Sequence, residues 1–121
     1  MITREKIEEI KSQFPNLTPR GIRWYNKMKK QHLEDFLDDN SVSRITHAVY
    51  WMRLYNKSKK TGLESNSRDL KDYMDRVTES KTKSGEFILG LIFNGYTIKE
   101  LSDSPQVLCN MSGLPESLYL K

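Results

Sequence analysis

The cationic side chains of this chain have a clear chemical use, because they are segregated from the acidic ones. Between Glu9 and Glu34 every charged residue is Lys or Arg, and the same holds between Asp39 and Glu64. The cations of the two windows are Lys11, Arg20, Arg23, Lys27, Lys29 and Lys30, then Arg44, Arg53, Lys57, Lys59 and Lys60. Segregated positive charge is typical of a surface that binds a polyanion such as a sugar–phosphate backbone.

Helical spacing gathers most of these cations on two faces. On an α-helix, the four cations at positions 20, 23, 27 and 30 fall within one arc of about 80°. On a helix through residues 43–60, three further cations share a side with Tyr50, away from the apolar stripe. The predicted nucleic-acid-binding residues are Arg20, Arg23, Trp24, Lys27, Lys30, Tyr50, Arg53, Lys57 and Lys60.

Aromatic residues accompany the cations and raise the possibility of base stacking. Those in or beside the two windows are Trp24, Tyr25, Tyr50, Trp51 and Tyr55. Aromatic residues at helical spacing are more often part of a core than of a binding surface, so their exposure decides the matter. Trp24 stands at the edge of the basic arc and is the best exception. The pattern predicts a small basic, non-enzymatic nucleic-acid-binding or regulatory protein.

Two histidines offer an enzymatic alternative. His32 and His47 can serve as the acid and base of a small ribonuclease, because histidine titrates near neutral pH. His32 and Glu34 also have the His-x-Glu spacing of zinc deaminases, but the chain has a single cysteine and no Pro-Cys-x-x-Cys partner. The deaminase hypothesis is therefore excluded, and the ribonuclease hypothesis stays open beside the non-enzymatic one.

No metal or cofactor is predicted. Asp35, Asp38 and Asp39 lack the ligand-loop spacing of a cation site, and an acidic helix end is normally solvated. Cys109 lies in a predicted strand, where a small buried side chain is the usual outcome. The glycines match no phosphate-binding loop.

A protein-interaction module, such as a small inhibitor or adaptor from a mobile element, is the competing class of function. The acidic set that would meet a basic partner is Glu34, Asp35, Asp38 and Asp39. The edge of a C-terminal hairpin offers a second contact, either with a partner strand or with a second copy in a homodimer. These surfaces are distinct from the basic faces, so the two hypotheses are separable.

Length and composition limit the kind of protein that can carry these sites. A chain of 121 residues fits one domain, residues 1–121, with a helical part to about residue 94 and a hairpin and tail after it. One cysteine allows no internal disulfide, and no signal-peptide pattern is present, so we expect a cytoplasmic protein. The longest apolar run, residues 87–93, is too short to cross a membrane.

The first half of the chain predicts three helices. Thr3 caps the first helix, which runs to about Phe14 before Pro15. Thr18 followed by Pro19 predicts the start of a long second helix to about residue 39. Ser41 or Ser43 caps a third helix that stops at residues 61–62. The first two helices, joined by a short turn at residues 15–17, are a weak helix-turn-helix candidate.

The second half predicts two helices and a hairpin. Ser67 caps a fourth helix over residues 68–78, and Ser84 caps a fifth over residues 86–93 that ends at Asn94-Gly95. The fifth is the most apolar and is the expected core helix. Residues 96–101 and 107–111 predict a β-hairpin. The expected fold is α+β and mainly α, with five helices packed as a small bundle and one C-terminal hairpin.

Overall fold

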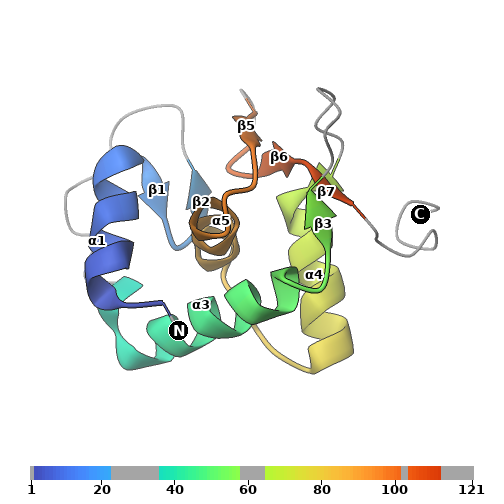
Figure 1. The fold of residues 1–121 in the computed structure, drawn as a ribbon, viewed down its shortest axis with the longest axis horizontal. Helices are drawn as coiled ribbons and strands as arrows, with labels where there is room; N and C mark the ends of the chain where they lie inside the picture. The colour runs from blue at the N-terminus through green and yellow to red at the C-terminus, as the bar shows by residue number, and fades with distance from the viewer. Residues whose placement is uncertain (1, 23–35, 58–64, 102–103, 113–121) are drawn as a thin grey trace.

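The computed structural model describes residues 2–22, 36–57, 65–101 and 104–112, and within them the fold is mixed helix and small antiparallel sheets (Figure 1). The described helices are α1 (Arg4–Gln13), α3 (Asp39–Met52), α4 (Ser67–Thr78) and α5 (Ser84–Phe93). The described strands are β1 (Leu17–Thr18), β2 (Gly21–Ile22), β3 (Asn56–Lys57), β4 (Ser65–Asn66), β5 (Ile98–Glu100), β6 (Val107–Cys109) and β7 (Met111–Ser112). The α+β class is confirmed, although the described part holds four helices and more sheet than one hairpin.

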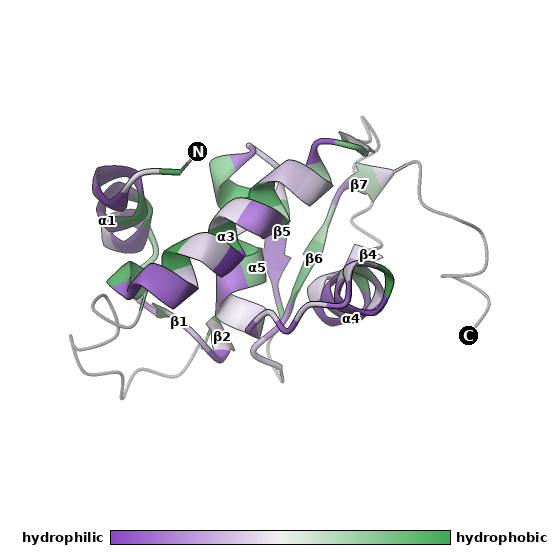
Figure 2. Cartoon of the chain, turned by 90° about the horizontal axis from the view of Figure 1, so that it is seen from below, coloured by the Kyte–Doolittle hydropathy of each residue, from purple (hydrophilic) through white to green (hydrophobic). Residues whose placement is uncertain are grey.

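Helix α5 is the centre of the fold, as its apolar sequence predicts. Phe87, Ile88, Leu89 and Leu91 are all fully buried, so this helix has no solvent side over its middle turns. Helices α1, α3 and α4 surround it together with strands β1 and β2 (Figure 1). Figure 2 shows the hydrophobic residues concentrated on α5 and β6, while α1 and α4 turn hydrophilic residues outward. Within the described ranges, no helix combines the length and hydrophobicity that crossing a membrane requires.

The first helix forms where its caps predict. The Thr3 hydroxyl accepts a hydrogen bond from the Lys6 backbone N–H at 3.2 Å, which satisfies one of the unpaired donors of the first turn. Ile7 and Ile10 are buried on one face. The helix ends at Gln13, two residues before Pro15, whose ring cannot continue it.

Helices α4 and α5 begin within two residues of their predicted starts. In α4 the cap is Asn66, whose side chain accepts from the Arg68 N–H at 2.8 Å. Ser67 is instead the first helical residue, and its hydroxyl accepts from the Val107 N–H at 3.0 Å. Serine was the right residue type for this junction, but its hydroxyl joins α4 to β6 rather than capping the helix.

The predicted start of the second helix is wrong. Residues 17–22 form the antiparallel hairpin β1–β2, with Leu17 opposite Ile22 and Thr18 opposite Gly21. The Thr18 hydroxyl accepts from the Arg20 N–H at 3.2 Å and donates to the Gly21 carbonyl at 3.1 Å, which closes the turn. Thr-Pro favours such a turn as well as a helix start. The hairpin also removes the short turn that the helix-turn-helix hypothesis needed.

The third helix starts earlier and ends earlier than predicted. Its cap is Asp38, which accepts from the Asn40 N–H at 2.9 Å, and its last residue is Met52. The buried Tyr96 hydroxyl lies 2.9 Å from the Met52 carbonyl and 3.2 Å from the Tyr55 carbonyl, so it satisfies backbone acceptors where the helix stops. The chain then turns into β3 instead of continuing toward residue 60.

The predicted C-terminal hairpin is present but belongs to a larger arrangement. Strands β5 and β6 pair with Ile98 opposite Cys109 and Glu100 opposite Val107, and β4 adds a third strand in the order β4-β6-β5. Strand β7 pairs with β3. Two-residue strands such as β3 and β4 are too short for a periodic signal, which is why the sequence did not reveal them. Cys109 is a buried free thiol, as expected.

Glycine allows α5 to approach the β1–β2 hairpin closely. A Cβ atom on Gly85 would stand 1.6 Å from the Thr18 carbonyl oxygen, and the Gly85 N–H donates to the Pro19 carbonyl at 3.0 Å. Any larger residue at position 85 would push the hairpin off the core helix. This contact positions Arg20, which lies in the turn between β1 and β2.

Candidate nucleic-acid interface

Four of the nine predicted nucleic-acid-binding residues lie in the described part of the chain. They are Arg20, Tyr50, Arg53 and Lys57. The other five, Arg23, Trp24, Lys27, Lys30 and Lys60, lie outside the described residues, as do His32, Glu34 and Asp35. The geometry therefore bears on the second basic window much more than on the first.

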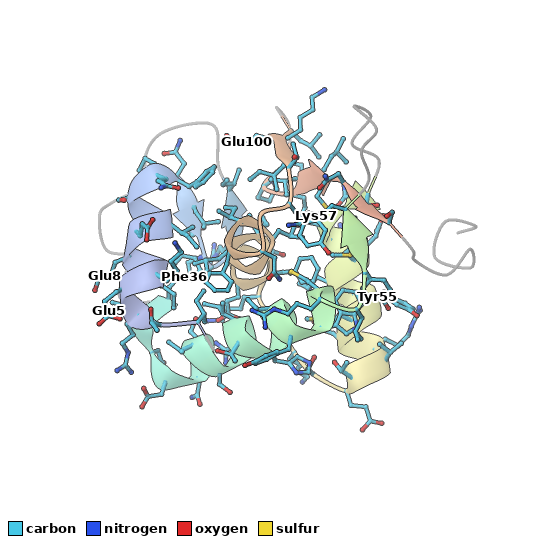
Figure 3. All side chains as sticks on the ribbon, viewed as in Figure 1. Glu5, Glu8, Phe36, Tyr55, Lys57 and Glu100 are labelled. Atoms are coloured by element: carbon cyan, nitrogen blue, oxygen red, sulfur yellow. The ribbon has the colours of Figure 1, made fainter. Side chains whose placement is uncertain are left out.

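The described cations do not share one face. The turn between β1 and β2, which carries Arg20, lies on the other side of α5 from β3 (Figure 1). Lys57 of β3 is exposed, and its Nζ lies 5.6 Å from the centroid of the Tyr96 ring (Figure 3). Because α3 ends at Met52 and Lys57 lies in β3, Arg53 and Lys57 do not share the predicted helix face, and Lys60 lies outside the described residues.

Tyr50 and Arg53 do come together, at the end of α3. The Arg53 Cζ lies 5.1 Å from the centroid of the Tyr50 ring, a cation–π distance. Tyr50 is 50% exposed and Arg53 is exposed. Among the described residues, no carboxylate forms a salt bridge with Arg53. A guanidinium stacked on a ring keeps its N–H donors at its edges, where a phosphate can accept them.

A second arginine–aromatic pair lies on α4. The Arg76 Cζ is 5.6 Å from the centroid of the Tyr73 ring. Tyr73 in turn packs against Trp51 of α3, with ring centroids 6.2 Å apart. Arg76 does not stand out in the sequence, because the charges of its helix nearly cancel. The spacing of three residues between Tyr73 and Arg76, equal to that between Tyr50 and Arg53, was the available signal.

We use the name α3–α4 seam for two groups of residues: the pair Tyr50 and Arg53 at the end of α3, and the cluster of Trp51, Tyr55, Tyr73 and Arg76 that joins α3 to α4. Trp51 is buried and its ring centroid lies 4.8 Å from that of Tyr55, so these two rings support the seam from inside. Figure 3 shows Tyr55 where the end of α3 meets α4. Burial, together with the neighbouring Tyr73, raises the pKa of Tyr55. A hydrogen bond of 3.1 Å between His47 Nε2 and Thr78 Oγ1 ties the two helices together further along.

Exposed apolar side chains border the seam. Leu54 is 76% exposed in the turn after α3, and Val77 is 52% exposed on α4. Val77 stands beside Thr78 and one helical turn after Tyr73, both of which contact α3. With Tyr50, these are the most exposed large apolar or aromatic side chains of the described residues.

Arg44 belongs to the same acid-free window but has a different role. Its guanidinium binds Glu86 through two hydrogen bonds, Nε to Oε1 at 2.7 Å and Nη2 to Oε2 at 2.9 Å. Glu86 is fully buried on α5 and also accepts from the Ser41 hydroxyl at 2.6 Å. This hydrogen bonding raises the pKa of Arg44. The pair fastens α3 to α5, so Arg44 is a structural cation.

Of the acidic residues of the alternative hypothesis, the two that the structure describes already have partners within the chain. Asp38 caps α3, and Asp39 forms a salt bridge with Arg4 of α1. The hairpin edge is β5, where Lys99 and Glu100 are exposed, and Figure 3 shows Glu100 at the outer end of this strand. Charged side chains on an edge strand oppose pairing with another strand.

A polar cleft of about 570 Å³ lies between the start of α4 and residues 104–106. The Lys71 ammonium in its lining already forms salt bridges, with Asp72 at 3.0 Å and with Asp75 at 3.3 Å. Its lining mixes both signs of charge, which does not favour an anion. No group of three or more metal-ligating His, Cys, Asp or Glu side chains occurs in the described ranges. The ribonuclease hypothesis stays a prediction, because the position of His32 relative to His47 is not described.

Comparisons with protein-family models, with curated proteins and with solved structures give no match for this chain. Its function therefore has to be argued from the seam and the charge pattern themselves.

Proposed function

We propose that this protein binds nucleic acid, with the phosphate backbone contacted by exposed cations of the two acid-free windows. The observation that carries the proposal is the stacking of Arg53 on the half-exposed Tyr50, at 5.1 Å from its ring centroid. A cation and an aromatic ring held together at the surface supply both contacts that a nucleic acid offers, phosphate and base.

The local charge supports the same proposal. The chain carries no acid between Asp39 and Glu64, and α4 adds Arg76 to the seam. Charges within about 10 Å of one another interact at moderate salt, so acids distributed elsewhere on the surface weaken this field little. The proposal also fits a reducing compartment such as the cytoplasm, since the single cysteine is a free thiol.

Fluorescence anisotropy of labelled nucleic acids at about 50 and 200 mM salt tests the proposal. We expect micromolar or tighter binding that weakens steeply as salt rises, because bound cations release counterions from the phosphates. Arg53→Glu should reduce the affinity strongly. The matched control is Lys99→Glu, which makes the same change in net charge on β5, on the far side of α5 from the seam (Figure 1).

Two results would contradict the proposal. The first is the lack of any binding by the wild-type protein at the lower salt. The second is an equal loss of affinity in Arg53→Glu and Lys99→Glu, which would assign the binding to net charge rather than to the seam.

A protein-interaction module is the second candidate, favoured by the exposure of Leu54 and Val77. For a homodimer that uses this surface, the mass measured by light scattering should rise with concentration. Leu54→Ser should then return the protein to a monomer without unfolding it, because the side chain is 76% exposed. A constant monomeric mass would remove the homodimer from consideration.

A further inference from the structure

We propose that the polar cleft at the start of α4 binds a small zwitterion, a free α-amino acid. Its carboxylate would be held by Arg68 and two serine hydroxyls, and its ammonium by Asp69. The cleft has a volume of about 570 Å³, within the range of small-molecule sites, which is roughly 300–1,000 Å³. Its lining residues are not those of the seam, so this inference goes beyond the proposed function and does not depend on it.

The floor of the cleft is formed by Gln106, a buried side chain that bridges the first residues of two helices. Its Oε1 accepts from the Ser67 hydroxyl of α4 at 2.8 Å, and its Nε2 donates to the Ser84 hydroxyl of α5 at 3.1 Å. The Gln106 backbone N–H donates to the Ser104 hydroxyl at 3.1 Å. The floor is therefore held in place by the protein alone, as a preformed site requires.

These bonds leave donors available on the floor. Ser84 and Ser104 both line the cleft and use their oxygens to accept from Gln106, and among the described residues their own protons have no acceptor. The Gln106 amide has a second N–H beyond the one given to Ser84. The starts of α4 and α5 add the positive potential of their first N–H groups. Such a floor suits the oxygens of a carboxylate.

The charges on the wall of the cleft are only partly paired. Lys71 and Asp72 form a salt bridge at 3.0 Å. The Arg68 Nε lies 4.0 Å from Asp72, which is longer than a hydrogen bond, and the Arg68 side chain is 72% exposed. Asp69 has no salt bridge within the described part of the chain. Because neighbouring residues on a helix point about 100° apart, Arg68 and Asp69 do not face each other. Each is left for a ligand.

A ligand with a single charge suits this wall less well. An anion bound at Arg68 would lie near the Asp69 carboxylate, and a cation bound at Asp69 would lie near the guanidinium and the helix starts. The four charged residues of the lining are Arg68, Lys71, Asp69 and Asp72, whose formal charges cancel. An α-amino acid has no net charge and carries both signs a short distance apart. Each of its charges can therefore meet the opposite one.

The test is an NMR titration of the isotope-labelled protein with each of the protein amino acids in turn. We expect at least one of them to give saturable shifts in the backbone amide signals of Asp69, Ser84 and Gln106. Two derivatives of the best ligand are then compared with it: the amide, which lacks the carboxylate, and the N-acetyl form, which lacks the ammonium. Each should bind at least about tenfold more weakly, because each loses a hydrogen-bonded charge.

Two variants identify the partner of each charge. Asp69→Asn should weaken binding of the parent amino acid by at least about tenfold and leave the affinity for the N-acetyl form unchanged. Arg68→Gln should weaken binding of the parent in the same way and leave the affinity for the amide unchanged. The matched controls are Glu79→Gln and Lys81→Gln, which remove exposed charges outside the cleft and should have no effect. Circular dichroism checks that the helices of each variant are intact.

Three results would overturn the inference. The first is the lack of saturable shifts with any amino acid. The second is equal affinity for the parent amino acid and both derivatives, which would mean that its charges are not recognised. The third is a set of shifts in the same signals with inorganic phosphate alone, which would make the cleft an anion site. Nucleic-acid binding is measured separately by anisotropy, so the proposed function stands or falls independently of these results.

Discussion

The two ends of α3 are held by different chemistry, and the difference separates two arginines that look alike in the sequence. Toward the start of the helix, Arg44 neutralises Glu86, which lies 42 positions away on α5 and is fully buried. At the other end, the neutral Tyr96 hydroxyl satisfies the last carbonyls, and Arg53 stacks on Tyr50 at the surface. Arg44, whose charge is neutralised inside the fold, and Arg53, whose charge stays exposed, are therefore only nine residues apart.

The largest loss of stability is expected when Arg44, near the start of α3, is replaced. Arg44→Ala leaves the Glu86 carboxylate buried with its cationic partner removed, and we expect a loss of about 3–5 kcal/mol in the free energy of unfolding. Urea denaturation followed by circular dichroism measures it. A loss below about 1 kcal/mol would mean that the pair does not hold α3 to α5.

A double variant sharpens this prediction. Arg44→Met combined with Glu86→Leu replaces the ion pair with apolar side chains and should be more stable than Arg44→Ala, since no buried charge remains. The Ser41 hydroxyl loses its acceptor in this variant, so part of the loss should persist. If the double variant is the less stable of the two proteins, burial of an unpaired charge is not the cause.

Removing the Tyr96 hydroxyl at the end of α3 should lower the free energy of unfolding less than removing Arg44 does. Tyr96→Phe removes the donor to the Met52 and Tyr55 carbonyls, and we expect a loss of about 1–2 kcal/mol in the free energy of unfolding. Urea denaturation under the same conditions gives the comparison with Arg44→Ala. A loss as large as that of Arg44→Ala would erase the distinction between the two ends.

Alkaline pH should weaken the contact that Tyr96 makes at the end of α3, whereas Arg44 near the start of the helix stays charged. Burial raises the pKa of Tyr96 from 10.0 to about 12, and burial raises the pKa of Cys109 from 9.0 to about 11. The unfolded chain therefore loses these protons at lower pH than the folded protein does. Stability should fall as pH rises from about 9 to about 12. Urea midpoints across this range, with Tyr96→Phe as the comparison, should show a shallower fall above about pH 10 in the variant.

The smallest effect on stability is expected at Arg53. Arg53→Gln removes an exposed cation–π contact and should change the free energy of unfolding by about 0.5–1 kcal/mol or less. The same variant should lower the salt dependence of nucleic-acid binding by about one counterion. Urea denaturation and anisotropy at several salt concentrations measure the two effects. A large stability loss without a change in the salt dependence would assign Arg53 to the fold, as Arg44 is.

The sequence predicted the elements whose signals are local. The cap of α1, the apolar run of α5 and the β-branched and large apolar residues of β5 and β6 are local signals, and these elements formed close to their predicted bounds. The end of α3 was missed because it is set by Tyr96, which lies far along the chain. The β1–β2 hairpin was missed because Thr18-Pro19 fits a turn as well as a helix start.

The candidate site was predictable only in part, for the same reason. Tyr50 and Arg53 are three residues apart and were found together, although their exposure was not known. Arg76 was missed in the sequence because its helix also carries acids. In the structure Asp72 and Asp75 pair with Lys71, whereas Arg76 lies over the Tyr73 ring. Counting charges along the chain does not reveal which acids fold back onto which cations.

The pairing of the short strands also sets an order of events when the chain folds. Strand β3 pairs with β7 and strand β4 pairs with β6, so Asn56 meets Ser112 and Ser65 meets Cys109. Contacts between residues so distant in sequence form late, because a long loop has to close first. During synthesis, the helices can form as they leave the ribosome, while β3 and β4 wait for residues beyond 106. The turn that ends α3 at the seam is thus completed only after the last described strands have been made.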